Sequence, residues 1–117
     1  MPKTNQRTLR IPKFLKQEVE IIALNNSHNN KAPDSASGLF ENAFVLYKNS
    51  NNRLAWANKK TELIRTNLSI RDNLWEEARL YAKENKNNNI EPASIQDVFI
   101  ASMEQYLKCS QEKQDDK

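Results

Sequence analysis

The residues best suited to chemistry in this chain are polar side chains in two short stretches, where they alternate with Leu and Ile. The polar residues are Gln6, Thr8, Arg10, Arg65, Asn67 and Ser69. This alternation predicts two β-strands, each with one apolar and one polar face. Arginine can donate two hydrogen bonds to guanine in the DNA major groove, and asparagine or glutamine can pair in the same way with adenine. These six side chains are therefore candidates for reading DNA bases.

The two stretches belong to a repeat that covers most of the chain. One fixed shift places Leu9 on Leu68 and Ile11 on Ile70 without a gap. Further matched pairs are Leu15/Leu74, Ala23/Ala82, Asn26/Asn85, Pro33/Pro92, Ser35/Ser94, Phe40/Phe99 and Tyr47/Tyr106. One copy is too small to bury a stable core alone. We expect one compact domain over residues 1–117, with a first repeat at 6–48, a linker at 49–64, a second repeat at 65–108 and a disordered charged tail at 109–117.

Each repeat predicts a strand followed by two helices. The strands are expected at 6–11 and 65–70, with Pro12 in the first turn of the following helix. Helical spacing predicts four buried stripes: Leu15, Val19, Ile22 and Ala23; Leu39, Phe40, Ala43, Phe44 and Tyr47; Leu74, Ala78, Tyr81 and Ala82; and Val98, Phe99, Ser102, Met103 and Tyr106. Residues 26–32 and 85–91 are expected as Asn-rich loops. The first helix should end near Asn25 or Asn26 and the last near Lys108.

The two strands are expected to pair antiparallel, because a lone strand would leave both edges unpaired. This pairing gives a mainly α fold with a short two-stranded antiparallel β-ribbon, whose Leu and Ile residues face four helices and whose polar residues face outward. Such a ribbon fits the major groove. Because Arg10 corresponds to Ser69 and Gln6 to Arg65 in the repeat, we expect an asymmetric DNA site.

Phosphate contacts are expected at the start of each second helix. Ser35 and Ser94 can act as helix caps, and the exposed N–H groups beside them can also bind a phosphate oxygen. Gly38 in the first copy replaces Asp97 in the second, which favours phosphate at the first helix. The remaining expected phosphate-binding residues are Arg7, Lys13 and Arg71.

Composition narrows the class of protein. The net charge of +3 is mildly basic, and the first 16 residues contain basic side chains but no acid. A mean hydropathy of -0.87 and the lack of an apolar leader predict a cytoplasmic protein without a membrane span. Cys109 is the single cysteine and His28 the single histidine, so neither an enzyme, a metal site nor a cofactor is expected. An antitoxin-like or other protein-interaction module is the alternative to DNA binding.

Two tryptophans lie outside the four predicted stripes. Trp56 lies in an apolar part of the linker, with Leu54 and Ala55, and is expected to dock on the domain. Trp75 aligns with Lys16 in the repeat, and is expected either to cover the linker or to contact a partner.

The segment Leu9-Arg10-Ile11-Pro12 resembles the strand-to-helix junction of the ribbon-helix-helix family of DNA-binding proteins, which includes Arc and MetJ. In that resemblance Thr8 and Arg10 occupy base-reading positions. Two units in one chain resemble the TraY group of conjugative-plasmid proteins. The resemblance implies a tandem ribbon-helix-helix forming an intramolecular pseudo-dimer, a monomer with internal pseudo-two-fold symmetry. It further implies double-stranded DNA as partner, with a relaxase or further copies of the chain beside it. The implied role is a plasmid- or phage-type transcriptional regulator, such as a repressor, or a relaxosome accessory at the transfer origin.

Overall fold

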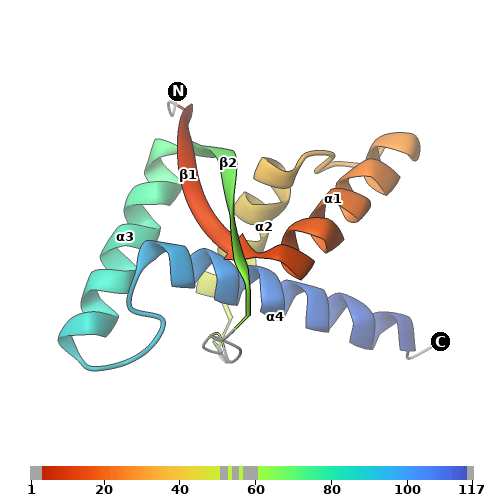
Figure 1. Cartoon of the computed structure of the whole chain (residues 1–117). Helices are drawn as coiled ribbons and strands as arrows, with labels where there is room; N and C mark the ends of the chain where they lie inside the picture. The colour runs from red at the N-terminus through yellow and green to blue at the C-terminus, as the bar shows by residue number, and fades with distance from the viewer. Residues whose placement is uncertain (1–3, 51–52, 54–55, 57–60, 116–117) are drawn as a thin grey trace.

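The protein is mostly helical, with one two-stranded antiparallel sheet. A computed structural model describes residues 4–50, 53, 56 and 61–115. Its elements in chain order are β1 (Thr4–Pro12), α1 (Lys13–His28), α2 (Ala36–Lys48), β2 (Leu63–Arg71), α3 (Asp72–Asn87) and α4 (Ile95–Asp115). The strands form a ribbon with α1 and α3 on opposite sides of it, and α4 runs across the ends of the strands that face the linker (Figure 1). This arrangement confirms the predicted class and the predicted order of strands and helices.

The ribbon has one buried and one exposed face, as the alternation of residues predicted. β1 and β2 pair antiparallel over their whole length, from Thr4 opposite Arg71 to Pro12 opposite Leu63. The inward side chains of Leu9, Ile11, Leu68 and Ile70 are all buried. Both strands are longer than expected, and Pro12 belongs to the end of β1 instead of the first helical turn. Its backbone stays extended because the next N–H, that of Lys13, donates to Glu62 O (3.1 Å) and continues the pairing.

The core joins both halves of the chain. The buried residues of all four helices and both strands form one cluster. α2 and α4 meet at its centre, where the rings of Phe44 and Phe99 lie 5.5 Å apart. Most of the predicted stripe residues are buried, whereas Ile22, Tyr81 and Tyr106 are only partly buried at the edge of the cluster. Neither half could bury its apolar stripes without the other.

The repeat extends to the hydrogen bonds of the turns between helices. Asn26 Nδ2 donates to Pro33 O at 2.8 Å, and Asn85 Nδ2 donates to Pro92 O at 2.8 Å. Each turn also contains an asparagine in the left-handed region, with φ of 55° at the first and 56° at the second. Asparagine tolerates this conformation better than most residues. The same turn therefore occurs at matching positions in the two halves.

Three boundaries differ from the sequence-based expectation. α1 continues to His28 and α3 to Asn87, so part of each expected Asn-rich loop is helical. The reason is that Asn26 and Asn85 use their side chains to fix the following turn while their backbone remains helical. α4 continues past Lys108 to Asp115, so the expected disordered tail is helical through that residue. Gln, Glu and Lys in this segment are good helix formers, which explains the extension.

The linker and the termini are described in part. Trp56 is buried in the core cluster, which confirms its expected docking. Leu54, Ala55, residues 1–3 and the end of the tail lie outside the described residues. No helix in the described ranges combines the length and the apolar character needed to cross a membrane.

Candidate nucleic-acid interface

The exposed face of the ribbon brings together all six side chains singled out by the sequence. They are exposed, and they form three facing pairs, Gln6 with Ser69, Thr8 with Asn67 and Arg10 with Arg65. At the centre Thr8 Oγ1 donates to Asn67 Oδ1 at 2.8 Å. This bond restricts the Asn67 side chain without burying it. The face therefore offers amide, hydroxyl and guanidinium groups in three successive levels.

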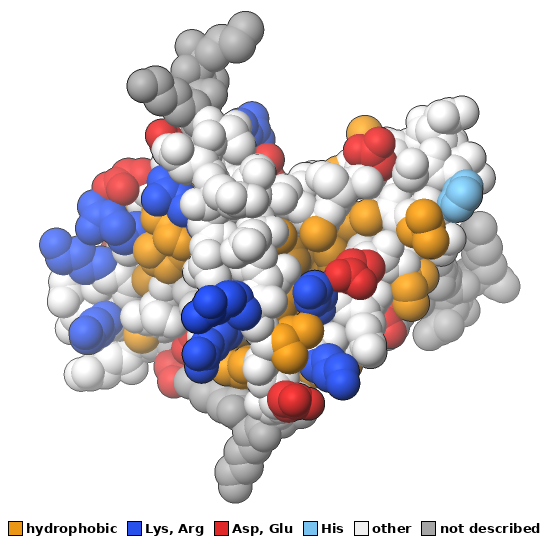
Figure 2. All heavy atoms as spheres, turned by 45° about the horizontal axis from the view of Figure 1, so that its top comes forward, with side chains coloured by type: hydrophobic (Ala, Val, Ile, Leu, Met, Phe, Trp, Pro, Cys, Tyr) orange, Lys and Arg blue, Asp and Glu red, His pale blue; other side chains and the backbone are white. Residues whose placement is uncertain are grey.

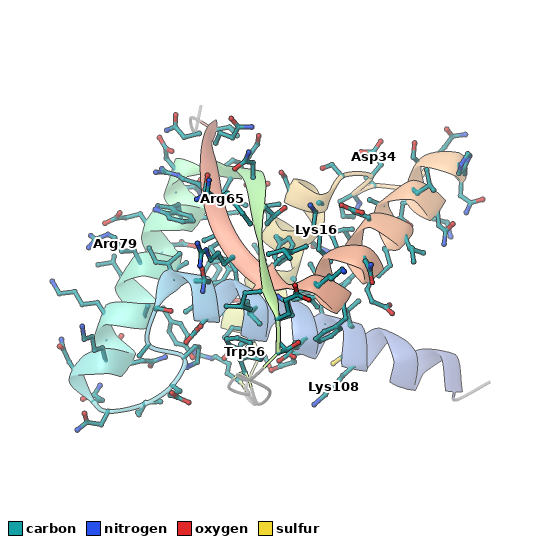
Figure 3. All side chains as sticks on the ribbon, viewed as in Figure 1. Lys16, Asp34, Trp56, Arg65, Arg79 and Lys108 are labelled. Atoms are coloured by element: carbon teal, nitrogen blue, oxygen red, sulfur yellow. The ribbon has the colours of Figure 1, made fainter. Side chains whose placement is uncertain are left out.

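Arg10 and Arg65 make this face unusual in its electrostatics. The two residues are directly opposite in the register, which places like charges in a cross-strand pair. Such a pair is unfavourable for folding. Neither guanidinium forms an ion pair with any residue that the structure describes. Arg65 projects from the exposed side of the ribbon in Figure 3, and Figure 2 shows basic side chains clustered near the middle of the face that it displays. Two cations held together without an acid favour an anionic or electron-rich ligand.

The first turns of α2 and α4 lie against the outer edges of the ribbon. Ser37 Oγ accepts a hydrogen bond from the Ser69 N–H (2.7 Å), and Gln96 Oε1 accepts one from the Arg10 N–H (2.9 Å). Ser37 and Gln96 are matched in the repeat, and each bonds to a strand edge that would otherwise leave an N–H unpaired. Neither residue was predicted from the sequence. Each of them lies two residues after the serine cap of its helix, and this shared position is the feature of the sequence from which they could have been predicted.

The caps themselves are as expected. Ser35 Oγ accepts from the Gly38 N–H and Ser94 Oγ accepts from the Asp97 N–H, each at 3.1 Å. Because the first turns of α2 and α4 are bonded to the strand edges, both helix N-termini lie beside the ribbon. The serine caps occupy the N–H groups of Gly38 and Asp97, so a phosphate there would bind other N–H groups of the same first turns. The phosphate role of Ser35 and Ser94 stays a prediction.

The three cations expected to bind phosphate differ in how they are engaged. The Lys13 side chain is exposed, and no ion pair joins it to another described residue. Arg71 donates to Glu41 Oε2 from its backbone N–H (2.7 Å) and from Nε (3.3 Å). Arg7 Nη2 donates to Asp72 Oδ1 at 3.0 Å. A phosphate at Arg7 or Arg71 would therefore compete with a carboxylate already in place.

Arg7 is tied to the helices on a second side. Its guanidinium lies 4.8 Å from the centre of the Trp75 ring, and that ring stacks on Phe99 with centroids 5.9 Å apart. Trp75 thus supports an arginine over the core. Most of the linker that Trp75 was expected to cover lies outside the described residues. The sequence could not reveal the pairing of Arg7 with Trp75, because it depends on the register of the two strands.

Comparison with known proteins gives no further guide. No family model, curated protein or solved structure matches this chain. Within the described residues there is also no cluster of three or more His, Cys, Asp or Glu side chains that could hold a metal ion. What the protein binds must be inferred from its own side chains, and the exposed ribbon face has the most distinctive set.

Proposed function

We propose that this protein binds double-stranded DNA in a sequence-specific way, with the exposed face of the ribbon in the major groove. The observation that carries the proposal is the six-residue polar face in which Arg10 and Arg65 stand opposite each other with no acidic partner among the described residues. The major groove admits a two-stranded ribbon. A ribbon inserted there would present its polar residues to base edges while its apolar face remained on the helices.

The side-chain types support base reading over simple charge attraction. Arginine pairs with guanine through O6 and N7, and asparagine or glutamine pairs with adenine through N6 and N7. Each bidentate contact is worth about 1–3 kcal/mol of discrimination against a wrong base. With two Arg, one Asn and one Gln on the face, the ribbon has enough donors and acceptors for moderate specificity.

We also propose that the chain is a tandem ribbon-helix-helix protein, in which the two repeats form an intramolecular pseudo-dimer. Three features support this. The strand, helix, helix order occurs twice, the turns repeat, and Thr8 pairs with Asn67, its own counterpart in the repeat. A pseudo-two-fold axis through the Thr8–Asn67 level would relate the two halves. The protein would then act as a monomer.

Two biological roles follow from this type of DNA binding. The protein could act as a cytoplasmic repressor that occludes a promoter, or as a relaxosome accessory that marks a plasmid transfer origin for a relaxase. Further copies could occupy adjacent sites. The two roles are distinguished by where the protein binds on the DNA of its own host and plasmids.

The test is capture of fragmented host and plasmid DNA by the purified protein at moderate salt, followed by mapping of the bound pieces. Enrichment at a promoter indicates a repressor, and enrichment beside a transfer origin indicates a relaxosome accessory. Arg10→Ala with Arg65→Ala should abolish enrichment with the circular dichroism spectrum unchanged. The matched control is Arg79→Ala, which removes an exposed arginine on α3 that is already paired with Glu76. Equal recovery of all fragments by the wild type would refute sequence-specific binding.

One observation favours the protein-interaction alternative. The large side chains of Phe14, Ile21 and Leu24 on α1 are 43%, 57% and 58% exposed. At the matching positions α3 has Asn73 and Lys83 beside an exposed Leu80. If α1 contacts a partner, Phe14→Asn with Leu24→Lys should leave DNA binding intact while abolishing that contact.

A further inference from the structure

We propose that the ribbon reads its DNA site with a fixed polarity. Arg10 and Arg65 together recognise two neighbouring G·C pairs at one end of the site. Toward the opposite end, the Gln6–Ser69 level has no arginine, and Arg71 at the next level is held by Glu41. This inference rests on the proposed DNA-binding function. Beyond DNA binding itself, the inference specifies which base pairs are read and in which orientation the protein lies on them.

The register of the strands places both arginines at the same end. Arg10 is on β1 and Arg65 on β2, yet they are direct partners. Residues two apart along a strand are separated by about 6.8 Å, which is close to two base-pair rises of about 3.4 Å. The arginine level therefore lies about two base pairs from the Thr8–Asn67 level and about four from the Gln6–Ser69 level at the other end.

The spacing across the ribbon suits two adjacent guanines. Directly opposite residues in an antiparallel pair have Cα atoms about 4.5–5.5 Å apart. Because the strands run along the groove, this separation lies across it, and the two long arginine side chains can lean in opposite directions along the groove to reach adjacent base pairs. Each guanidinium can then donate to O6 and N7 of its own guanine. Arg10 and Arg65 would read two consecutive G·C pairs instead of competing for one base.

The matching level toward the other end of the ribbon lacks this chemistry. In the repeat, Arg10 corresponds to Ser69 and Arg65 corresponds to Gln6. The level that matches the arginine pair is therefore Gln6 opposite Ser69. Glutamine pairs best with adenine, and serine reads bases with little selectivity. No cation occupies this level. The two ends of the site should therefore differ in sequence, and only one orientation of the protein should match both.

The same polarity explains why the unfavourable arginine pair is tolerated. The two like charges stand opposite each other and lack an ion-pair partner among the described residues. DNA would relieve their repulsion, because the guanine edge presents two acceptors and the groove has a negative potential. The Gln6–Ser69 level has no such repulsion to relieve.

The experiment selects binding sites from random DNA with three proteins. These are the wild type, Arg65→Gln, and a fourfold swap, Q6R with R10S, R65Q and S69R. The swap exchanges counterparts within the repeat, so it keeps composition and net charge while moving the arginine pair to the other end of the ribbon. Each protein is also prepared with Thr4→Cys and Cys109→Ser, so that its single cysteine is at position 4. An iron chelator attached to this cysteine, beside the Gln6–Ser69 level, then cleaves the nearby DNA.

For the wild type we expect adjacent G·C pairs at one end of the selected site and cleavage at the other end. The swap should again select adjacent G·C pairs at one end of the site but cleave beside them. Arg65→Gln should weaken binding to the wild-type site by roughly 5- to 150-fold, corresponding to about 1–3 kcal/mol, with a much smaller loss on random DNA. If the swap does not fold by circular dichroism, loss of one selected G·C pair in Arg65→Gln decides the question.

Other outcomes would overturn the polarity. G·C pairs at both ends of the site, or cleavage at both ends, would show that the ribbon binds symmetrically. Equal weakening on every sequence, with a reduced salt dependence, would show that the arginines contact phosphates. Both results would leave DNA binding intact. Failure of the wild type to bind any DNA would instead refute the proposed function.

Discussion

Arg65→Gln should make the free protein more stable while it weakens DNA binding. The substitution removes one charge from the Arg10–Arg65 pair and installs the residue that stands at the matching position, Gln6. With Cα atoms about 5 Å apart and side chains free to splay, the two charges lie about 8 Å apart. Their repulsion at the dielectric constant of water is about 0.5 kcal/mol. Screening reduces it to about 0.4 kcal/mol at 0.01 M salt and below about 0.1 kcal/mol at 1 M.

The assay is urea denaturation of wild type and variant at both salt concentrations. A gain of about 0.4 kcal/mol corresponds to an increase of roughly 0.2–0.4 M in the urea midpoint for a protein of this size. We expect that increase at low salt and almost none at 1 M. Arg79→Gln is the control, because it removes an arginine that is paired with Glu76 and should lower the midpoint or leave it unchanged. A lower midpoint for Arg65→Gln at low salt, or an effect independent of salt, would show that the arginines do not repel each other in the free protein.

Four further substitutions test the structure of the ribbon and of the helices that pack on it. Trp75→Lys, which installs the residue found at the matching position, should cost about 1–3 kcal/mol in urea denaturation because the ring loses its stacking on Phe99. Ser37→Ala and Gln96→Ala should each cost about 0.5–1.5 kcal/mol, because each leaves a strand-edge N–H without its acceptor; unchanged stability would mean that water replaces the bond at no cost. Burial raises the pKa of Glu104, so the folded protein binds a proton more tightly there than the unfolded chain, and stability falls as pH rises through the raised pKa. Glu104→Gln should therefore raise the urea midpoint more at pH 7 than at pH 4, and an equal rise at both would contradict this.

Much of the fold could be predicted from local sequence patterns. The alternation around Leu9 and Leu68 fixed which strand face is buried, because a strand has a period of two and one face must meet the core. The apolar stripes at helical spacing located the helices for the same kind of reason. Helix ends were less predictable. Asn26 favours turns in general, but here its side chain bonds to Pro33 O while its backbone stays helical.

Contacts that depend on strand register could not be predicted from the sequence. Arg7 was expected to bind phosphate, and it lies in a segment of basic residues that contains no acid. Antiparallel pairing brings it to Asp72 and Trp75, both on α3 and far away in the chain. Only the register decides which of the many arginines is neutralised and which stays unpaired. The same register made Arg10 and Arg65 neighbours, which neither strand alone could indicate.

Having both repeats in one chain permits a ribbon that a symmetric dimer could not form. In a dimer of identical units, any pair at one end of the ribbon recurs at the other end by symmetry. An arginine pair would then occur twice, with twice the repulsion in the free protein and a palindromic DNA site. In this chain the counterparts of Arg10 and Arg65 are Ser69 and Gln6, so the pair occurs once. Arg7 is a second example. It pairs with Asp72 and lies over the Trp75 ring, whereas its counterpart Thr66 is uncharged and requires neither contact. Covalent linkage of the two halves therefore allows each strand its own chemistry, and the directional DNA site that we propose would be its functional consequence, which the selection and cleavage experiments test.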